Sequence, residues 1–82
     1  MIKKNKKKIE KEILLIASKI FKINRNELTI NSNTRNTPQW DSLNHINLLI
    51  ELKKNFKLKL DINEVSEINS LKKWQKIITK KF

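Results

Sequence analysis

The 82-residue sequence predicts a single all-α domain with three principal helices, one short helix and a long loop between the first two. Two observations carry this prediction. Apolar residues recur at three-to-four-residue spacing in three stretches, which is typical of amphipathic helices. No stretch outside residues 57–60 shows convincing strand alternation, and there is no internal repeat or domain boundary within residues 1–82. A chain of this length forms one small domain with little room for an enzyme cleft.

The first helix is expected from Ile9 to Phe21, with Asn24 as a left-handed stop. Residues 1–8 carry five lysines and are expected to be a frayed, solvated end or an extension of that helix, rather than a nucleic-acid-binding arm. The helix shows the spacing of a buried stripe, which two further residues widen: Ile9, Ile13, Ile16, Ala17 and Ile20, with Leu14 and Phe21.

Residues 24–40 form a loop of about seventeen residues that holds Pro38, the one proline of the chain. A loop this long in so small a domain is usually functional. Leu28 is expected to pin it to the core. Pro38 disfavours helical geometry at Thr37, so the next helix is not expected to begin earlier.

The second helix is expected from Ser42 to Phe56, with Asp41 as its N-cap. The predicted core stripe is Ile46, Leu49, Leu52 or Lys53, and Phe56. Leu43 and Ile50 lie off the centre of this stripe and are expected to be partly exposed. Exposed aliphatic side chains beside a helix start are a candidate partner surface.

The C-terminal third is expected to begin with a short extended connector or an irregular exit of the second helix, followed by a short helix and a final long helix. Residues 57–60 alternate lysine with leucine, and Asp61 to Glu64 has the form of a capping box that opens a short helix ending near Glu67. Asn69 or Ser70 is expected to cap the last helix, which turns four side chains inward: Leu71, Trp74, Ile77 and Ile78.

The charge balance has two interpretations. Nineteen basic against eight acidic residues give a net charge of +11, which at face value suggests a nucleic acid, an anionic lipid or an acidic protein as partner. However, Lys, Asn and Ile together supply 41 of the 82 residues, a skew that codon bias toward A and T would produce. Compositional drift is therefore the preferred origin of most lysines, and nucleic acid is not an expected partner.

Several kinds of chemistry lack the residues that they need. Without cysteine the chain has no disulfide, no thiolate metal site and no thiol nucleophile. The longest apolar run, residues 13–17, is too short for a membrane span or a signal-peptide core, so a cytoplasmic location is expected. The absence of glycine excludes a Gly-rich phosphate loop.

The remaining candidate groups favour structural roles. His45 follows Ser42 by three residues, but Asp41 adjoins Ser42 and cannot readily orient the imidazole, so His45 is expected to be an exposed polar residue rather than part of a catalytic dyad. One histidine without cysteine leaves no metal site. Trp40 and Trp74 are expected to be packing anchors.

Asp41-Ser42-Leu43 and the apolar residues that follow it closely resemble acyl carrier proteins and related phosphopantetheine-binding carriers. The resemblance covers nearly the whole chain after the lysine-rich start, from the helix at Ile9 through Glu27-Leu28-Thr29 to the last helix. The tripeptide is weak by itself, but its place after a long loop and before a matching helix makes the match specific. The matching positions after the tripeptide are Ile46, Leu48-Leu49-Ile50, Leu52, Phe56, Leu60, Asp61, Glu64, Ile68, Leu71 and Ile77-Ile78.

The resemblance implies an acyl-carrier-like four-helix bundle in which Ser42 receives 4′-phosphopantetheine from coenzyme A. A separate phosphopantetheinyl transferase, using Mg²⁺, would modify Ser42, while Asp41 would position the loop and meet that transferase. The carrier would be a non-catalytic monomer that holds acyl groups as thioesters and passes them between a loading ligase or synthase and acyl-transfer enzymes. The implied partner face is Leu43, Asn47, Ile50 and Lys54, with apolar contact added by Val65 and Ile68.

The departures from the family are informative. Gln39-Trp40 replaces the usual Gly-Ala before Asp-Ser-Leu, and with Asn44-His45 after it this segment looks more like stand-alone carriers of specialised or surface-glycan pathways. Lysines also replace the acidic residues that fatty-acid carriers present on the second helix, which disfavours basic partners. Thr34 stands where the family commonly has an apolar loop residue, so weaker loop anchoring is expected.

Three alternatives remain open at the level of sequence. The first is an aminoacyl or peptidyl carrier, since its arm chemistry is identical. The second is a small basic helical binder of nucleic acid or membrane surfaces in which Asp-Ser-Leu is coincidental. The third is a carrier-like fold that has lost its arm and serves only as an adaptor.

Overall fold

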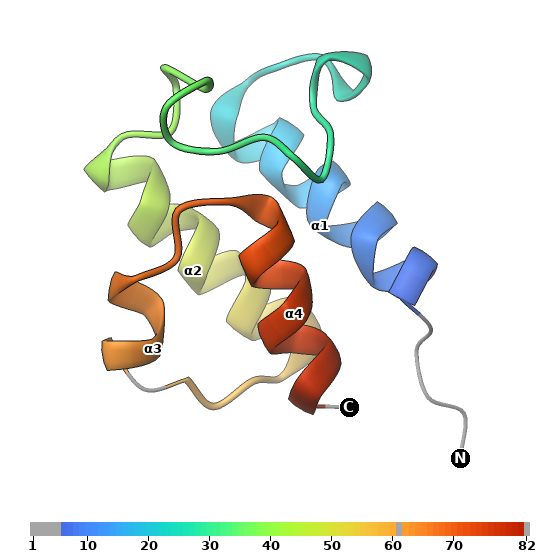
Figure 1. Cartoon of the computed structure of the whole chain (residues 1–82), viewed down its shortest axis with the longest axis vertical. Helices are drawn as coiled ribbons and strands as arrows, with labels where there is room; N and C mark the ends of the chain where they lie inside the picture. The colour runs from blue at the N-terminus through green and yellow to red at the C-terminus, as the bar shows by residue number, and fades with distance from the viewer. Residues whose placement is uncertain (1–5, 61, 82) are drawn as a thin grey trace.

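The computed structural model describes residues 6–60 and 62–81, and these residues are helical with connecting loops (Figure 1). Residues 1–5 of the basic lead-in and Asp61 of the expected capping box lie outside the described residues. The described part of the chain contains no strand, only an isolated bridge between Asn33 and Ser70. The all-helical class is therefore confirmed. The elements in order are α1 (Lys6–Phe21), the 3₁₀ turn η1 (Arg25–Glu27), α2 (Ser42–Phe56), α3 (Ile62–Ser66) and α4 (Leu71–Lys81).

The core lies where α1 packs against both α2 and α4. Burying these large aliphatic and aromatic side chains is the main favourable term in folding so small a domain. Trp40 and Trp74 are both buried, as expected of packing anchors. The largest fully buried side chains come from all three long helices: Ile9, Ile13, Leu48, Leu52, Leu71, Trp74 and Ile78.

The core stripe of α2 differs from the predicted one. Leu48, Leu52 and Phe56 are buried, whereas Ile46, expected inside, is exposed. The helix carries apolar residues around much of its circumference, so its pattern allows two stripes, and packing on α1 selects the row spaced by four residues. Leu43 and Ile50 are exposed as expected.

Both long helices that precede loops end on a left-handed lysine. Lys22 has φ of 56° and Lys57 has φ of 52°, whereas Asn24, the predicted stop of α1, has φ of −59°. In each case the next residue closes the helix by a backbone bond to the residue five positions earlier: Ile23 N to Ser18 O (3.0 Å) and Leu58 N to Lys53 O (3.1 Å). This is the Schellman arrangement, which usually places glycine at the left-handed position.

The long loop is tied to the start of α4. Thr34 N donates to Asn69 O at 3.0 Å, and Leu71 N donates to Ser32 O at 3.0 Å. Leu28 is buried, which confirms it as the residue that pins the loop to the core. The loop is thus anchored through its backbone at Thr34, while the weaker side-chain anchoring expected there stays a prediction.

Ser70, one of the two candidate caps, precedes α4 and caps its N-terminus. Its Oγ accepts a hydrogen bond from Lys73 N at 3.2 Å. The helix then turns Leu71, Trp74 and Ile78 into the core, as predicted, and leaves Ile77 half-buried. None of the helices in the described residues has both the length and the apolar character needed to cross a membrane.

Candidate functional site

Asp41 caps α2 and fixes the geometry of its first turn. Its backbone is extended, and its side-chain Oδ1 accepts a hydrogen bond from Asn44 N at 2.9 Å. Its carbonyl oxygen accepts the first helical bond, from His45 N at 2.8 Å. The side chain of Asn44 donates in turn to Gln39 O at 2.8 Å, which holds the end of the loop against the helix start. The N-cap prediction is confirmed.

Ser42 is the first residue of α2, and its side chain is exposed. The backbone N–H groups of a first helical turn have no intrahelical acceptors, and the helix dipole places positive potential there. The hydroxyl therefore stands in solvent at a position that favours an anion. It lines a groove of about 460 Å³ formed by the loop, α2 and the α3–α4 turn: Thr34, Trp40, Asp41, Ser42, His45, Ile46, Ser66, Ile68 and Asn69.

Trp40 and His45 also line this groove, and their side chains contact each other. Trp40 Nε1 donates to His45 Nδ1 at 3.1 Å, and the two rings are stacked with centroids 6.2 Å apart. The indole N–H can only donate, so Nδ1 must be the acceptor and the ring proton lies on Nε2. His45 Nε2 then donates to Val65 O at 3.3 Å. On its other side Trp40 contacts the ring of Phe21, with centroids 5.3 Å apart.

His45 is therefore not the exposed polar residue that the sequence suggested. It is half-buried and connects α2 to α3 through the carbonyl of Val65. Because Trp40 and Val65 occupy its two nitrogens, neither nitrogen is directed at Ser42 in this arrangement. The local pattern could not reveal this role, since one of its two partners lies twenty residues away.

The residues of the expected partner face differ in exposure. Leu43 and Ile50 are 68% and 49% exposed, Lys54 is exposed and Asn47 is half-buried. Val65 and Ile68, which were expected to add apolar contact, are each only 4% exposed and belong to the core. Their side chains pack mainly inward, although Ile68 also lines the groove beside Ser42. Ile46, which was assigned to the core, is 53% exposed and is the third aliphatic residue of this face.

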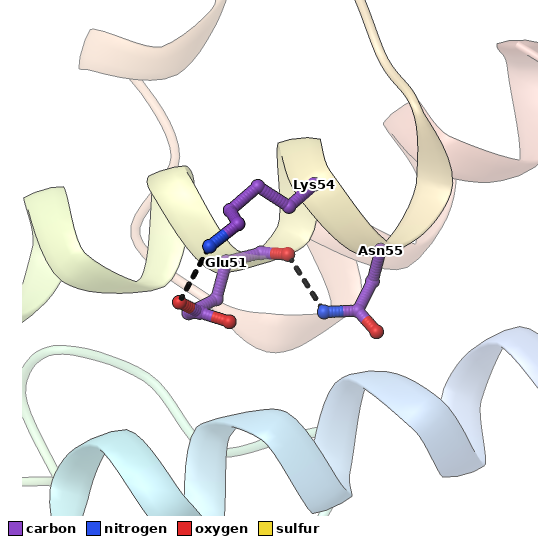
Figure 2. Close-up of polar contacts among 3 residues, drawn as sticks. All are labelled: Glu51, Lys54 and Asn55. Atoms are coloured by element: carbon purple, nitrogen blue, oxygen red, sulfur yellow. Dashed lines mark hydrogen bonds and ion pairs between the residues drawn. The ribbon is translucent and has the colours of Figure 1, made fainter.

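One edge of the contact between α2 and α1 carries polar side chains of α2 (Figure 2). Lys54 Nζ lies 4.0 Å from Glu51 Oε1, and Asn55 Nδ2 donates to Glu51 O at 2.9 Å. Glu51 and Asn55 line a groove with Leu15, Ile16, Lys19 and Ile20 of α1. The carboxylate of Glu51 thus lies beside α1 rather than among the exposed aliphatic residues of α2.

Among the described residues, no group of three His, Asp or Glu side chains could hold a metal ion. No protein-family model matches the chain, and no curated protein matches its sequence.

Proposed function

We propose that this chain is a carrier protein that receives 4′-phosphopantetheine on Ser42 and holds acyl groups for partner enzymes. One observation carries the proposal: Ser42 presents an exposed hydroxyl at the first position of α2, held by the Asp41 cap beside a groove and an exposed apolar helix face. The order of α1, a long loop, α2, a short α3 and α4 is the order that the resemblance to acyl carrier proteins implies, and it supports the same proposal.

The residues around Ser42 fit a phosphodiester group. A negative charge at this position is stabilised by the N-terminal end of the α2 dipole and by first-turn N–H groups. The adjoining groove offers Trp40 and Ile46 as apolar walls and Thr34, Ser66 and Asn69 as polar ones, which suits an arm that alternates methylene and amide groups. When bound, the arm supplies the terminal thiol that this cysteine-free chain lacks, and that thiol holds the acyl group as a thioester.

The modification needs a separate transferase, coenzyme A and Mg²⁺. Ser42 Oγ forms a new bond to phosphorus while the pyrophosphate bond of coenzyme A breaks, so the nucleotide bisphosphate leaves and the hydroxyl proton passes to a base on the transferase. The hydrogen bonds from Asn44 N to Asp41 Oδ1 and from Asn44 Nδ2 to Gln39 O hold Ser42 in one place relative to the loop. A fixed nucleophile lowers the entropic part of the barrier to attack.

The proposed carrier acts in the cytoplasm and is itself non-catalytic. Its partners are the transferase, a loading ligase or synthase, and acyl-transfer enzymes. An aminoacyl or peptidyl cargo would use the same serine and the same arm.

Mass spectrometry after incubation with coenzyme A, Mg²⁺ and a broad-range phosphopantetheinyl transferase tests this function. The intact chain is expected to gain the mass of one phosphopantetheinyl group, and Ser42→Ala is expected to gain nothing. Ser66→Ala is a matched control, because Ser66 is also exposed and lines the same groove. Absence of any gain in the unaltered chain, or a gain that persists in Ser42→Ala, would contradict the proposal.

A further inference from the structure

The solvent side of α2 is divided along the helix axis into an apolar half and a basic half. At about 100° of rotation per residue, six of its residues fall within about 120° of arc on the side opposite to Leu48 and Leu52. Five of the six are exposed and Asn47 is half-buried. We name these residues the α2 stripe: Leu43, Ile46, Asn47, Ile50, Lys53 and Lys54.

The stripe contains no acidic residue. Its apolar half, Leu43, Ile46 and Ile50, adjoins Ser42, and its basic half, Lys53 and Lys54, lies toward the other end of the helix. The exposed left-handed Lys57 extends the basic half by a further turn. Glu51 lies outside the stripe, on the adjoining flank beside α1, but its carboxylate is 4.0 Å from the Nζ of Lys54 and partly balances the charge of that lysine (Figure 2).

We propose that the α2 stripe docks a partner protein whose contact surface has an apolar centre and, about 12 Å further along the helix direction, a cluster of carboxylates. The spacing follows from the rise of about 1.5 Å per residue between Ile46 and Lys54. Apolar contact supplies affinity when the exposed aliphatic side chains are buried, and opposite charges guide the encounter and fix its direction.

The division of the stripe favours a protein over other anionic partners. A nucleic acid would contact lysines through its phosphates and would leave Leu43, Ile46 and Ile50 in water. An anionic membrane surface would attract the exposed lysines of α4, such as Lys72 and Lys76, as strongly as those of α2. On one face of α2 an apolar patch continues into a cationic patch. This arrangement instead matches a partner protein on which an apolar patch continues into a cluster of carboxylates.

The stripe also gives the partner an orientation. The lysines lie at the end of α2 remote from Ser42, so a partner that pairs with them places its apolar centre next to the helix start. That such docking delivers a loaded arm rests on the proposed function. The docking itself does not require Ser42 to be modified, so it can be measured on the unmodified chain.

Two synthetic helical peptides titrated into the ¹⁵N-labelled full chain test the proposal by NMR. Both carry three leucines at positions i, i+3 and i+7; one has glutamates two turns further along and the other has lysines there. The acidic peptide is expected to shift the amide signals of the α2 stripe and to bind at least about tenfold more tightly than the basic peptide. Its affinity is expected to fall as NaCl rises from about 50 to about 300 mM.

Charge-reversal variants identify the surface. Lys53→Glu/Lys54→Glu is expected to reverse the preference between the two peptides. Lys76→Glu/Lys80→Glu makes the same change in net charge in the C-terminal half of α4 and is expected to leave the preference intact. Unfolding curves of both variants establish that they remain folded at the titration temperature.

Three outcomes would overturn the proposal. The first is equal binding of the acidic and basic peptides. The second is a set of shifts spread over α1 and α4 rather than α2. The third is an equal effect on the stripe signals by a single-stranded oligonucleotide or by phosphatidylglycerol vesicles. A chain that binds the acidic peptide but is not modified at Ser42 would retain the docking surface and lose the carrier function, so the two proposals fail separately.

Discussion

At the scale of single residues, Asp41 determines how α2 begins. Its Oδ1 accepts the hydrogen bond from Asn44 N, one of the N–H groups that the helix itself cannot satisfy. Removing this cap in Asp41→Ala is expected to lower the free energy of unfolding by about 1 kcal/mol. Urea denaturation followed by circular dichroism measures the change.

The variant Asp41→Asn separates two roles of Asp41: capping of α2, and recognition of its carboxylate by the proposed transferase. Asparagine caps a helix about as well as aspartate, so the stability of this variant is expected to stay within a few tenths of a kcal/mol of the unaltered chain. If Asp41→Asn is stable but is modified much more slowly at Ser42, the proposed transferase recognises the negative charge of the Asp41 carboxylate. Unchanged stability in Asp41→Ala would show that the cap contributes little.

Local sequence pattern predicted Asp41 but not His45, and the reason is the range of their partners. The partner of Asp41 is three residues away within the same helical turn, whereas His45 bonds to Val65 O across twenty residues. The two tryptophans were correctly assigned as anchors because large aromatic side chains in a small helical domain are usually buried. The bond from Trp40 to His45 was missed, since sequence alone does not show how a loop enters a helix.

At the scale of helices, the two left-handed lysines show how a chain without glycine ends its helices. A residue with a Cβ atom is strained at positive φ, whereas glycine is not. Lys57→Gly is therefore expected to raise the free energy of unfolding by about 0.5–1 kcal/mol, with the Schellman bond from Leu58 N to Lys53 O retained. Thermal and urea unfolding measure the gain.

Lys54→Gly is the matched control for this prediction. Lys54 is also an exposed lysine, three residues earlier in the right-handed last turn of α2. Glycine there is expected to cost about 1 kcal/mol, because it loses more backbone freedom on folding and gains no relief of strain. Equal effects of the two substitutions would refute the argument from positive φ.

The positions of the helices were predictable from the apolar spacing. Which face of each helix is buried was predictable for some helices only. In α1 and α4 the apolar residues form one stripe, and the predicted inward residues are buried or half-buried. In α2 the apolar residues occupy much of the circumference, so the predicted stripe placed Ile46 inside, whereas Ile46 is exposed and Leu48 is buried. The orientation of Val65 and Ile68 depends on how α3 and the α3–α4 turn pack, which no local period encodes.

At the scale of the whole molecule, the net charge of +11 is carried by a domain whose radius of gyration is only 11.8 Å. Fold class was predictable because helical spacing, length and the absence of strand alternation agree. The functional meaning of the net charge was not predictable, because composition does not say where the lysines lie on the surface. The structure separates lysines that continue an apolar face, on α2, from those spread along the solvent side of α4.

Self-repulsion of this charge is expected to make the fold more stable as salt is added. Two unit charges about 20 Å apart in water repel by about 0.2 kcal/mol, and many such pairs add up in a small domain. The screening length falls from about 30 Å at 0.01 M salt to about 8 Å at 0.15 M, so most cross-molecule repulsion is removed. Unfolding exposes the same charges at larger separations, and the folded state gains more from screening.

Urea unfolding at 10 and 150 mM NaCl measures this gain, since urea is uncharged. The free energy of unfolding is expected to rise by on the order of 1 kcal/mol. The variant Lys72→Gln/Lys76→Gln/Lys80→Gln lowers the net charge by three on exposed positions of α4, and its salt dependence is expected to be smaller. A decrease in stability with salt would mean that attractive pairs, such as Glu51 with Lys54, outweigh the general repulsion. The lysines would then be structural partners rather than a positive surface to be met by an acidic protein.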